Sequence, residues 1–576
     1  MPRFPASGCP MPAPVARRRR CAAAWALAAL TAIALQSGPP VSGQSEAPSR
    51  RTVDTTEGPV TGGVAAGVAS WKGLAFAAAP TGDLRWRAPR PAPFHPEARL
   101  ALDYGPRCPQ DDRGDLRPGL GRTGVEDCLQ LNVWAPAEAS SESRLPVLFW
   151  IHGGGMVQGA STTPLYDGSG LARSEQVIVV STNYRLGALG FLAHPAFLDQ
   201  DPGQPRAGNY GLLDQQAALA WVGRNIEAFG GDPERILIFG ESAGGVSVCS
   251  HMASPLARGR FAAAIMQSGN CLTTSIPALD TARGAVPAAF EQGRRFAAAT
   301  GCDQAADPAA CLRALPVETI LDTLPGEVGL LDPGAETYGP TVDGYVLLEP
   351  PGDAIRGGRA ARLPFVAGTT ADEASIFLPP GPMRYAQFAS LVAGLFPTQT
   401  DRILAHYPED LYPDGRAALS AVTTDLAFGC PTRRAMRDHA AWGNPAWLYH
   451  FTRVPAYAEA AGVGSHHGVE IAYLFDSFGA ALRRSLTAPD LRLTARMQSD
   501  WASLARSSAP AASDSPAWPS LGQARLAGLQ LGDAISVETG WRAERCDLWD
   551  EIAGWSPLVL PAPEPSHAIH LPWLGR

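Results

Sequence analysis

The chain has 576 residues, of which 45% are hydrophobic and 18% are charged. These proportions are typical of a folded globular protein and exclude a largely disordered or collagen-like chain. The formal net charge is −8, so bulk electrostatics give no reason to expect nucleic-acid binding. The length allows three domains of average size, but large α/β enzymes often use such a length for one.

The N-terminal segment has the pattern of a secretory signal. Four arginines at 17–20 precede an apolar run at 21–35, and small and polar residues follow it. This run is shorter than the ~20 residues that a membrane-spanning helix needs. We therefore expect residues 1–43 to be a signal peptide, with an uncleaved N-terminal anchor as the alternative. Because no later apolar run is long enough to span a bilayer, we expect a secreted or periplasmic protein without stable membrane insertion. The near absence of lysine, together with 60 glycines and 53 prolines, is typical of a GC-rich bacterial genome, so we expect a bacterial source.

The middle of the chain alternates between short apolar runs and helical segments. Continuous apolar runs are typical of strands that are buried on both faces of a parallel sheet. One helix is expected at 212–229, because its apolar residues recur at helical spacing and Gly230-Gly231 follows. The pattern predicts an α/β fold, with short antiparallel strands at 51–100. The expected buried strands lie at 146–151, 177–180, 236–239, 262–266, 364–367 and 446–449.

Residues 240–244 (GESAG) match the G-x-S-x-G motif and follow the expected strand at 236–239. In this context the serine lies on a sharp turn between strand and helix, which leaves room only for small neighbours. The turn exposes the Ser242 hydroxyl and places a helix N-terminus near the negative charge that forms during acyl transfer. Ser242 is therefore the predicted nucleophile, and a glycine-rich turn around a buried serine is the alternative.

A second glycine-rich segment, residues 152–155 (HGGG), ends the expected strand at 146–151. Consecutive glycines allow backbone N–H groups to approach a ligand oxygen, as an oxyanion hole requires. We expect Gly154, Gly155 and Ala243 to supply these groups. A dinucleotide-binding loop is excluded, because the G-x-G-x-x-G pattern and its later acidic residue are absent. His152 has no evident acidic partner, so we expect it to be structural.

Several longer motifs resemble the type-B carboxylesterase family. This resemblance covers residues 52–555, and the family includes carboxylesterases, cholinesterases and the inactive neuroligins. It implies the α/β-hydrolase fold, with a large, mostly parallel sheet flanked by helices and small antiparallel strands at its N-terminal end. We therefore expect one domain at 44–555 and a Pro-rich tail at 556–576. The motifs are 126–134 (EDCLQLNVW), 183–187 (NYRLG), 208–215 (GNYGLLDQ) and 229–244, which joins FGGDP to FGESAG.

The resemblance also implies the two partners of Ser242. The acid is Glu373, in the segment 368–375 (GTTADEAS), where Ala374 replaces the usual glycine. The base is His467, in the segment 465–471 (SHHGVEI). Their order after the serine is the order that this fold uses. We interpret Asp372 as a solvated loop carboxylate and His466 as a neighbour of the base.

Some polar residues near these motifs have a weaker assignment. The resemblance places Glu241 and Ser268 beside the triad, although both are equally compatible with hydrogen-bonded core positions. A metal site formed by His466, His467 and Glu470 is rejected, because their spacing matches no zinc motif. No metal or organic cofactor is implied.

Eight cysteines remain after removal of the signal peptide, and an oxidising compartment favours their pairing. Local spacing favours Cys108–Cys128 and Cys302–Cys311, and the resemblance implies the same two pairs. It also implies a long-range pair between Cys430 and Cys546. A fourth pair, between Cys249 and Cys271, competes with the interpretation of these two residues as buried free thiols.

The sequence thus predicts a secreted serine carboxylic-ester hydrolase that forms an acyl-enzyme. A cholinesterase is disfavoured, because no aromatic residue lies between Cys108 and Cys128 to stack on a quaternary ammonium. The alternatives are a specialised toxin ester, polyester, carbamate or amide substrate and, from another class, a non-catalytic neuroligin-like binding protein. The expected partner is a small ester, and neither the natural ester nor the oligomeric state is assigned.

Overall fold

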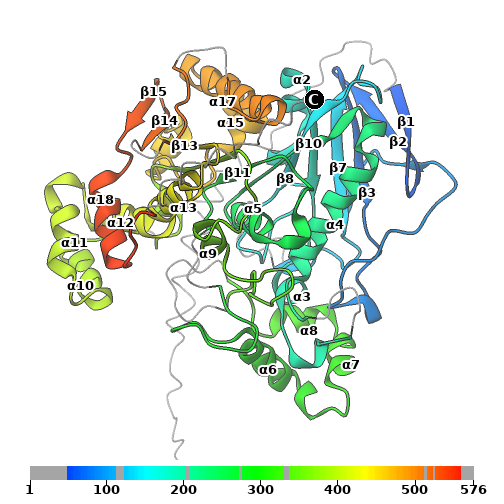
Figure 1. Ribbon diagram of the computed structural model, residues 1–576, viewed down its shortest axis with the longest axis horizontal. Helices are drawn as coiled ribbons and strands as arrows, with labels where there is room; N and C mark the ends of the chain where they lie inside the picture. Colours follow the sequence, from blue (N-terminus) through cyan, green and yellow to red (C-terminus); the bar gives the residue numbers. More distant parts are fainter. Residues whose placement is uncertain are drawn as a thin grey trace, which may run out of the picture.

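One large mixed sheet runs through the chain in the computed structural model. The structure describes residues 49–111, 122–200, 206–271, 276–327, 336–379, 381–511, 516–522 and 526–558. The predicted signal peptide and residues 559–576 of the predicted tail lie outside these ranges. Within them, thirteen strands form the sheet, with antiparallel strands at both ends (Figure 1). In order across the sheet these are β1 (Ser49–Thr55), β2 (Gly58–Ala65), β3 (Val68–Ala75), β7 (Gln130–Pro136), β9 (Ile178–Thr182), β8 (Leu145–Ile151), β10 (Gly231–Glu241), β11 (Ala263–Gln267), β12 (Phe365–Thr370), β13 (Ala446–Phe451), β14 (Ala527–Leu531) and β15 (Ile535–Thr539), with β4 (Arg99–Leu100) beside β2.

The parallel centre of the sheet runs from β9 through β8, β10, β11, β12 and β13 to β14. Its strands are mainly apolar because both faces are covered by helices. In β8, Phe149 and Ile151 belong to the core that includes side chains of α4 (Tyr210–Asn225) and α5 (Ala243–Ala253). Leu148 and Trp150 belong to the opposite core, which includes side chains of α17 (Ala488–Ser507). This arrangement confirms the predicted α/β-hydrolase fold.

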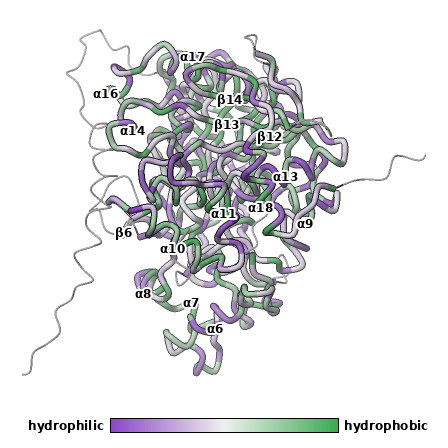
Figure 2. Tube along the Cα trace, turned by 90° about the vertical axis from the view of Figure 1, so that its left-hand side faces the viewer, coloured by the Kyte–Doolittle hydropathy of each residue, from purple (hydrophilic) through white to green (hydrophobic). Residues whose placement is uncertain are grey.

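The remaining helices surround these layers. Figure 1 shows α10, α11, α12 and α18 gathered at one side of the molecule, where they share a separate small apolar core. In Figure 2, α6, α7 and α8 lie at the end of the molecule away from α17. The bounds are α2 (Ser169–Glu175), α3 (Gly187–Phe191), α6 (Ala289–Thr300), α7 (Pro308–Arg313), α8 (Val317–Asp322), α9 (Pro351–Arg356), α10 (Tyr385–Leu395), α11 (Thr400–His406), α12 (Gly415–Thr424), α13 (Cys430–Ala441), α14 (Ala456–Ala461), α15 (Ile471–Phe475), α16 (Ala480–Arg483) and α18 (Ala543–Ile552).

The observed elements differ from the predicted ones mainly at their ends. The helix expected at 212–229 is α4 up to Asn225 and a 3-10 turn from Ile226 to Phe229, and Gly230 ends it with φ +98°. Strand β7 was not predicted, because its sequence includes the polar Asn132. The Asn132 amide donates hydrogen bonds to two buried serine hydroxyls, so the residue is satisfied within the sheet.

Four disulfides cross-link the described chain. The pairs are Cys108–Cys128, Cys249–Cys271, Cys302–Cys311 and Cys430–Cys546. The pairing of Cys249 with Cys271 excludes the interpretation of these two residues as free thiols. No helix in the described part of the chain has the length and hydropathy that a membrane span requires.

Candidate active site

A sharp turn between β10 and α5 carries Ser242. Its backbone angles are φ +57° and ψ −121°, a conformation that a non-glycine residue adopts only where its surroundings enforce it. A Cβ at Gly240 would lie 2.6 Å from the Gly244 backbone, and a Cβ at Gly244 would lie 2.0 Å from the Ile151 carbonyl oxygen. Both glycines are therefore sterically required, and the turn places Ser242 beyond the carboxyl end of a central strand.

The loops that follow β12 and β13 bring an acid and a histidine to this same edge of the sheet. Glu373 follows β12 and is fully buried. One of its oxygens, Oε1, accepts a hydrogen bond from the Thr370 backbone N–H at 2.7 Å. The other, Oε2, lies 2.5 Å from Nδ1 of His467. Because the carboxylate accepts, Nδ1 of His467 carries a proton, and in the neutral imidazole Nε2 is the nitrogen with the free lone pair.

Nε2 of His467 faces a second carboxylate. It lies 3.0 Å from Oε1 of Glu241, although the two groups do not have the alignment of a hydrogen bond. In the described residues, Ser242 and His467 share no hydrogen bond, and the Ser242 backbone N–H donates to the Gln267 carbonyl oxygen at 2.9 Å. Catalytic hydrogen bonds are often long or misaligned until substrate binds. The imidazole thus lies between two carboxylates next to the serine turn.

A third buried carboxylate, Glu470, completes this cluster and accepts a hydrogen bond from the Gln267 side chain at 3.2 Å. Burial acts to lower the pKa of His467, but the charges of Glu241 and Glu373 outweigh it and raise this pKa to about 9. Burial also raises the pKa of Glu241 and of Glu470. The electrostatics therefore favour an imidazolium at His467, the charge that this residue would carry after accepting a proton.

The predicted oxyanion glycines lie beside the serine. Gly154 and Gly155 have φ angles of +106° and +63°, so their backbone adopts a conformation that favours glycine. Their neighbour Gly153 packs so closely that a Cβ there would lie 3.1 Å from the Ser242 Cβ. Ala243 begins α5 on the other side of the serine. The glycine segment and the start of α5 thus both lie next to Ser242.

His152, which precedes these glycines, is buried and structural. Its ring stacks on Tyr184 with centroids 4.4 Å apart, and Nδ1 lies 2.8 Å from the Gly153 carbonyl oxygen. Burial lowers the pKa of His152 to about 4, so the imidazole is neutral near pH 7.

Asp372 and His466 are the chain neighbours of Glu373 and His467. Asp372 is half-buried, and its carboxylate accepts the Ser465 backbone N–H at 2.9 Å. Its interpretation as a solvated loop carboxylate was therefore wrong, because it joins the loop of Glu373 to the loop of His467. His466 directs Nδ1 to the His467 carbonyl oxygen at 2.9 Å, so its ring contacts the backbone of the adjacent histidine.

Ser268, which follows β11, is fully buried and has φ +47°. Its backbone N–H donates to the Gly368 carbonyl oxygen at 2.9 Å. Within the described residues its hydroxyl has no hydrogen-bond partner. Its side chain therefore does not fit the alternative interpretation of Ser268 as a hydrogen-bonded core residue.

Two aromatic rings that the sequence did not indicate flank the histidine. The ring centroids of Phe377 and Phe428 each lie 5.1 Å from that of His467. Phe428 is carried by a π-helical turn, Asp425–Gly429, between α12 and α13. Such turns are rare and have no simple periodic signature, so the sequence does not predict the position of Phe428.

A buried ion pair supports this turn and the acid loop together. Asp425 is paired with Arg542 and accepts a hydrogen bond from the Tyr407 hydroxyl at 2.7 Å. Arg542 also donates to the Ala371 carbonyl oxygen at 3.1 Å, two residues before Glu373. Arg545 also lies 3.8 Å from Asp425, whereas Arg542 has no other carboxylate at ion-pair distance in the described residues, so its buried charge depends on Asp425.

No group of three or more His, Cys, Asp or Glu side chains within the described ranges is arranged to hold a metal ion.

A strand–turn–helix serine with a histidine and an acid on later loops of a mostly parallel sheet defines an α/β-hydrolase. The model of the Carboxylesterase family matches residues 49–549. The chain therefore belongs to the carboxylesterase family, and it is a carboxylesterase.

Individual relatives agree with this assignment. The chain is 34% identical to the fumonisin B1 esterase of Sphingopyxis macrogoltabida, over 86% of this chain and 89% of that protein. It is also 34% identical to the para-nitrobenzyl esterase of Bacillus subtilis, over 86% and 98%. Among solved structures, a carboxylesterase of Geobacillus stearothermophilus, Est55, superposes with a TM-score of 0.73 at 30% identity, covering 86% of this chain and 99% of that one. A para-nitrobenzyl esterase structure gives a TM-score of 0.71 at 32% identity, covering 87% and 100%.

Proposed function

We propose that the protein hydrolyses carboxylic esters through a triad of Ser242, His467 and Glu373. The observation that carries the proposal is the 2.5 Å contact between Glu373 and His467 next to the strained turn of Ser242. Glu373 orients the imidazole, which removes the Ser242 proton as the hydroxyl oxygen attacks the ester carbonyl carbon.

The attack gives a tetrahedral intermediate whose oxyanion is bound by the N–H groups of Gly154, Gly155 and Ala243. The C–O bond to the alcohol then breaks, and the alcohol leaves with the proton from His467. A water molecule, deprotonated by the same imidazole, cleaves the acyl-enzyme and releases the carboxylic acid.

His467 must bring Nε2 to the serine hydroxyl for the first step. Its ring is held at Nδ1 by Glu373, so rotation of the Ser242 side chain and a small ring movement away from Glu241 would complete the contact. The raised pKa of His467 supports proton acceptance, because the two carboxylates stabilise the imidazolium.

The substrate is proposed to be a neutral ester. The rings of Phe377 and Phe428 beside His467 provide an apolar surface for it. The two relatives at 34% identity have names that specify different esters, so identity does not choose between a general and a specialised substrate.

We also propose that the protein is exported. Four disulfides are compatible with an oxidising compartment, which agrees with the signal predicted at residues 1–43.

The test is hydrolysis of p-nitrophenyl esters from acetate to palmitate by the wild type and by Ser242→Ala. We expect the wild type to hydrolyse at least the short esters and the folded variant to lose at least ~10³-fold in kcat. Labelling of the wild type, but not of the variant, by a serine-directed organophosphate would identify the nucleophile. Comparable hydrolysis by both proteins would refute the assignment of Ser242.

A further inference from the structure

A surface hollow of about 550 Å³ lies at the amino ends of β11 and β12. Two loops line it, residues 258–262 before β11 and residues 358–363 before β12. Ser242 and Glu373 follow the carboxyl ends of parallel strands, so the hollow lies at the opposite edge of the sheet from the candidate active site. The carboxylesterase chemistry uses none of its residues.

The hollow has an excess of positive charge. Arg258, Arg359 and Arg362 line it and are exposed, and Arg359 is paired with Glu349. Arg258 donates a hydrogen bond to the Arg359 carbonyl oxygen at 2.9 Å. The Arg362 guanidinium lies over the Trp442 ring, 5.5 Å from its centroid.

Neither Arg258 nor Arg362 has a carboxylate at ion-pair distance in the described ranges. On a chain with a net charge of −8, two uncompensated guanidinium groups beside one hollow create a local positive potential.

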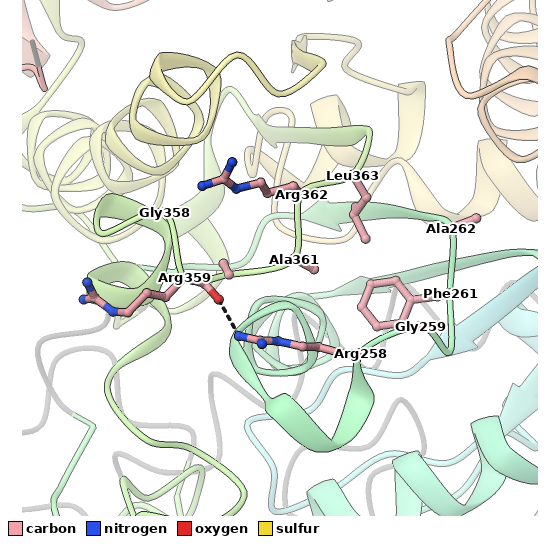
Figure 3. Close-up of a pocket in the computed structure, with 10 residues that line it drawn as sticks. Arg258, Gly259, Phe261, Ala262, Gly358, Arg359, Ala361, Arg362 and Leu363 are labelled. Carbon is pink, nitrogen blue, oxygen red and sulfur yellow. Dashed lines mark hydrogen bonds between the residues drawn. The ribbon is translucent and has the colours of Figure 1, made fainter. Parts of the chain in front are cut away.

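The opposite wall of the hollow is apolar. Phe261 and Leu363 line it, and each is 9% exposed. Figure 3 shows the guanidinium groups of Arg258, Arg359 and Arg362 on one side and the side chains of Phe261 and Leu363 on the other, with Arg359 and Arg362 extending outward. Solvation alone accounts for exposed arginines, but it does not account for the two apolar side chains that line the same hollow.

We propose that this arginine hollow binds a small organic anion, a carboxylate on a compact apolar body such as an aromatic ring. A carboxylate matches the planar donor geometry of guanidinium groups, and the apolar body would cover Phe261 and Leu363. The volume falls in the range of small-molecule sites. Inorganic phosphate would satisfy the arginines but leave the apolar wall exposed, so an organic carboxylate is the better match.

The proposal can be tested by isothermal titration calorimetry of the full chain with benzoate. Benzamide, which has the same shape without the charge, and inorganic phosphate, which has charge without an apolar body, are the comparison ligands. We expect one benzoate per chain, binding that weakens with added salt, and affinities for benzamide and phosphate at least tenfold lower.

Arg258→Gln/Arg362→Gln should weaken benzoate binding at least tenfold, because it removes both uncompensated charges. Arg484→Gln, which removes an exposed arginine elsewhere, is the matched control and should leave binding unchanged. Circular dichroism and the rate of ester hydrolysis, which should match the wild type, confirm that the double variant is folded.

Three results would overturn the proposal. They are no benzoate binding by the wild type, benzoate binding that the double variant retains, and phosphate binding as tight as that of benzoate. The second result would place benzoate elsewhere, for example at the active site as a product analogue. If the double variant does not fold, the single variant Arg362→Gln is measured by the same criteria, with a loss of at least threefold expected.

Discussion

The contact between Glu241 and His467 allows one variant to be predicted in quantitative terms. Glu241→Gln removes the carboxylate charge that lies 3.0 Å from Nε2 and keeps a side chain of nearly the same volume. The base must be neutral to accept the serine proton, so kcat/KM falls as the pH drops below the pKa of His467. Because Glu241 raises this pKa, its loss must move the acid limb of the profile to lower pH.

The distance sets an upper limit for the effect. At 3.0 Å and an effective dielectric constant of about 20, two unit charges attract by about 5.5 kcal/mol, or about 4 pKa units. Burial raises the pKa of Glu241 to about 7, which is still below the pKa of about 9 of His467, so Glu241 is ionised where the acid limb lies. Rearrangement of side chains and water around the pair reduces the net effect below the limit. We therefore expect the acid limb to move down by about 1–2 pH units.

The assay is the pH profile of kcat/KM for p-nitrophenyl acetate, with a correction for spontaneous hydrolysis. The plateau should also fall, because the imidazolium formed during attack loses a stabilising charge. Glu241→Asp keeps the charge and is the matched control, with a limb close to that of the wild type. An acid limb that stays in place or moves to higher pH in Glu241→Gln would refute the electrostatic role of Glu241.

Three further changes have expected outcomes. The double variant Cys249→Ala/Cys271→Ala should reduce the free energy of unfolding by ~3 kcal/mol, since its loop spans 22 residues; urea unfolding of the oxidised proteins measures this. Asp425→Asn should cost ~3–5 kcal/mol, because it leaves a buried guanidinium uncompensated. In the same measurement the exposed Asp533→Asn should cost less than ~1 kcal/mol, and equal losses would contradict the argument. Phe428→Ala should lower kcat/KM for p-nitrophenyl esters by at least ~10-fold through loss of packing on the imidazole, whereas an unchanged value at equal stability would show that the ring does not position it.

Features enforced by local sterics could be predicted from the sequence. The serine turn is one such feature, since Gly240 and Gly244 have no space for a Cβ. The parallel strands are another, because burial on both faces requires continuous apolar runs such as 146–151, which became β8. In both cases a few adjacent residues contain the physical cause.

Features that depend on contacts between distant segments could not be predicted in this way. Phe428 reaches the imidazole because a π-helical turn interrupts the path from α12 to α13. That turn is supported by Asp425 and Arg542, which come from separate parts of the chain. No periodicity in either segment indicates the pairing, since each residue alone resembles an ordinary surface charge.

Glu241 combines both cases. Its position next to Ser242 in the motif is local, but its effect depends on a histidine from the loop after β13, three strands away in the sheet. The turn that exposes Ser242 directs the adjacent Glu241 side chain inward, where burial raises its pKa and His467 lies within 3.0 Å. A carboxylate at this place would therefore raise the pKa of the proposed base, and only the three-dimensional fold brings the two groups together.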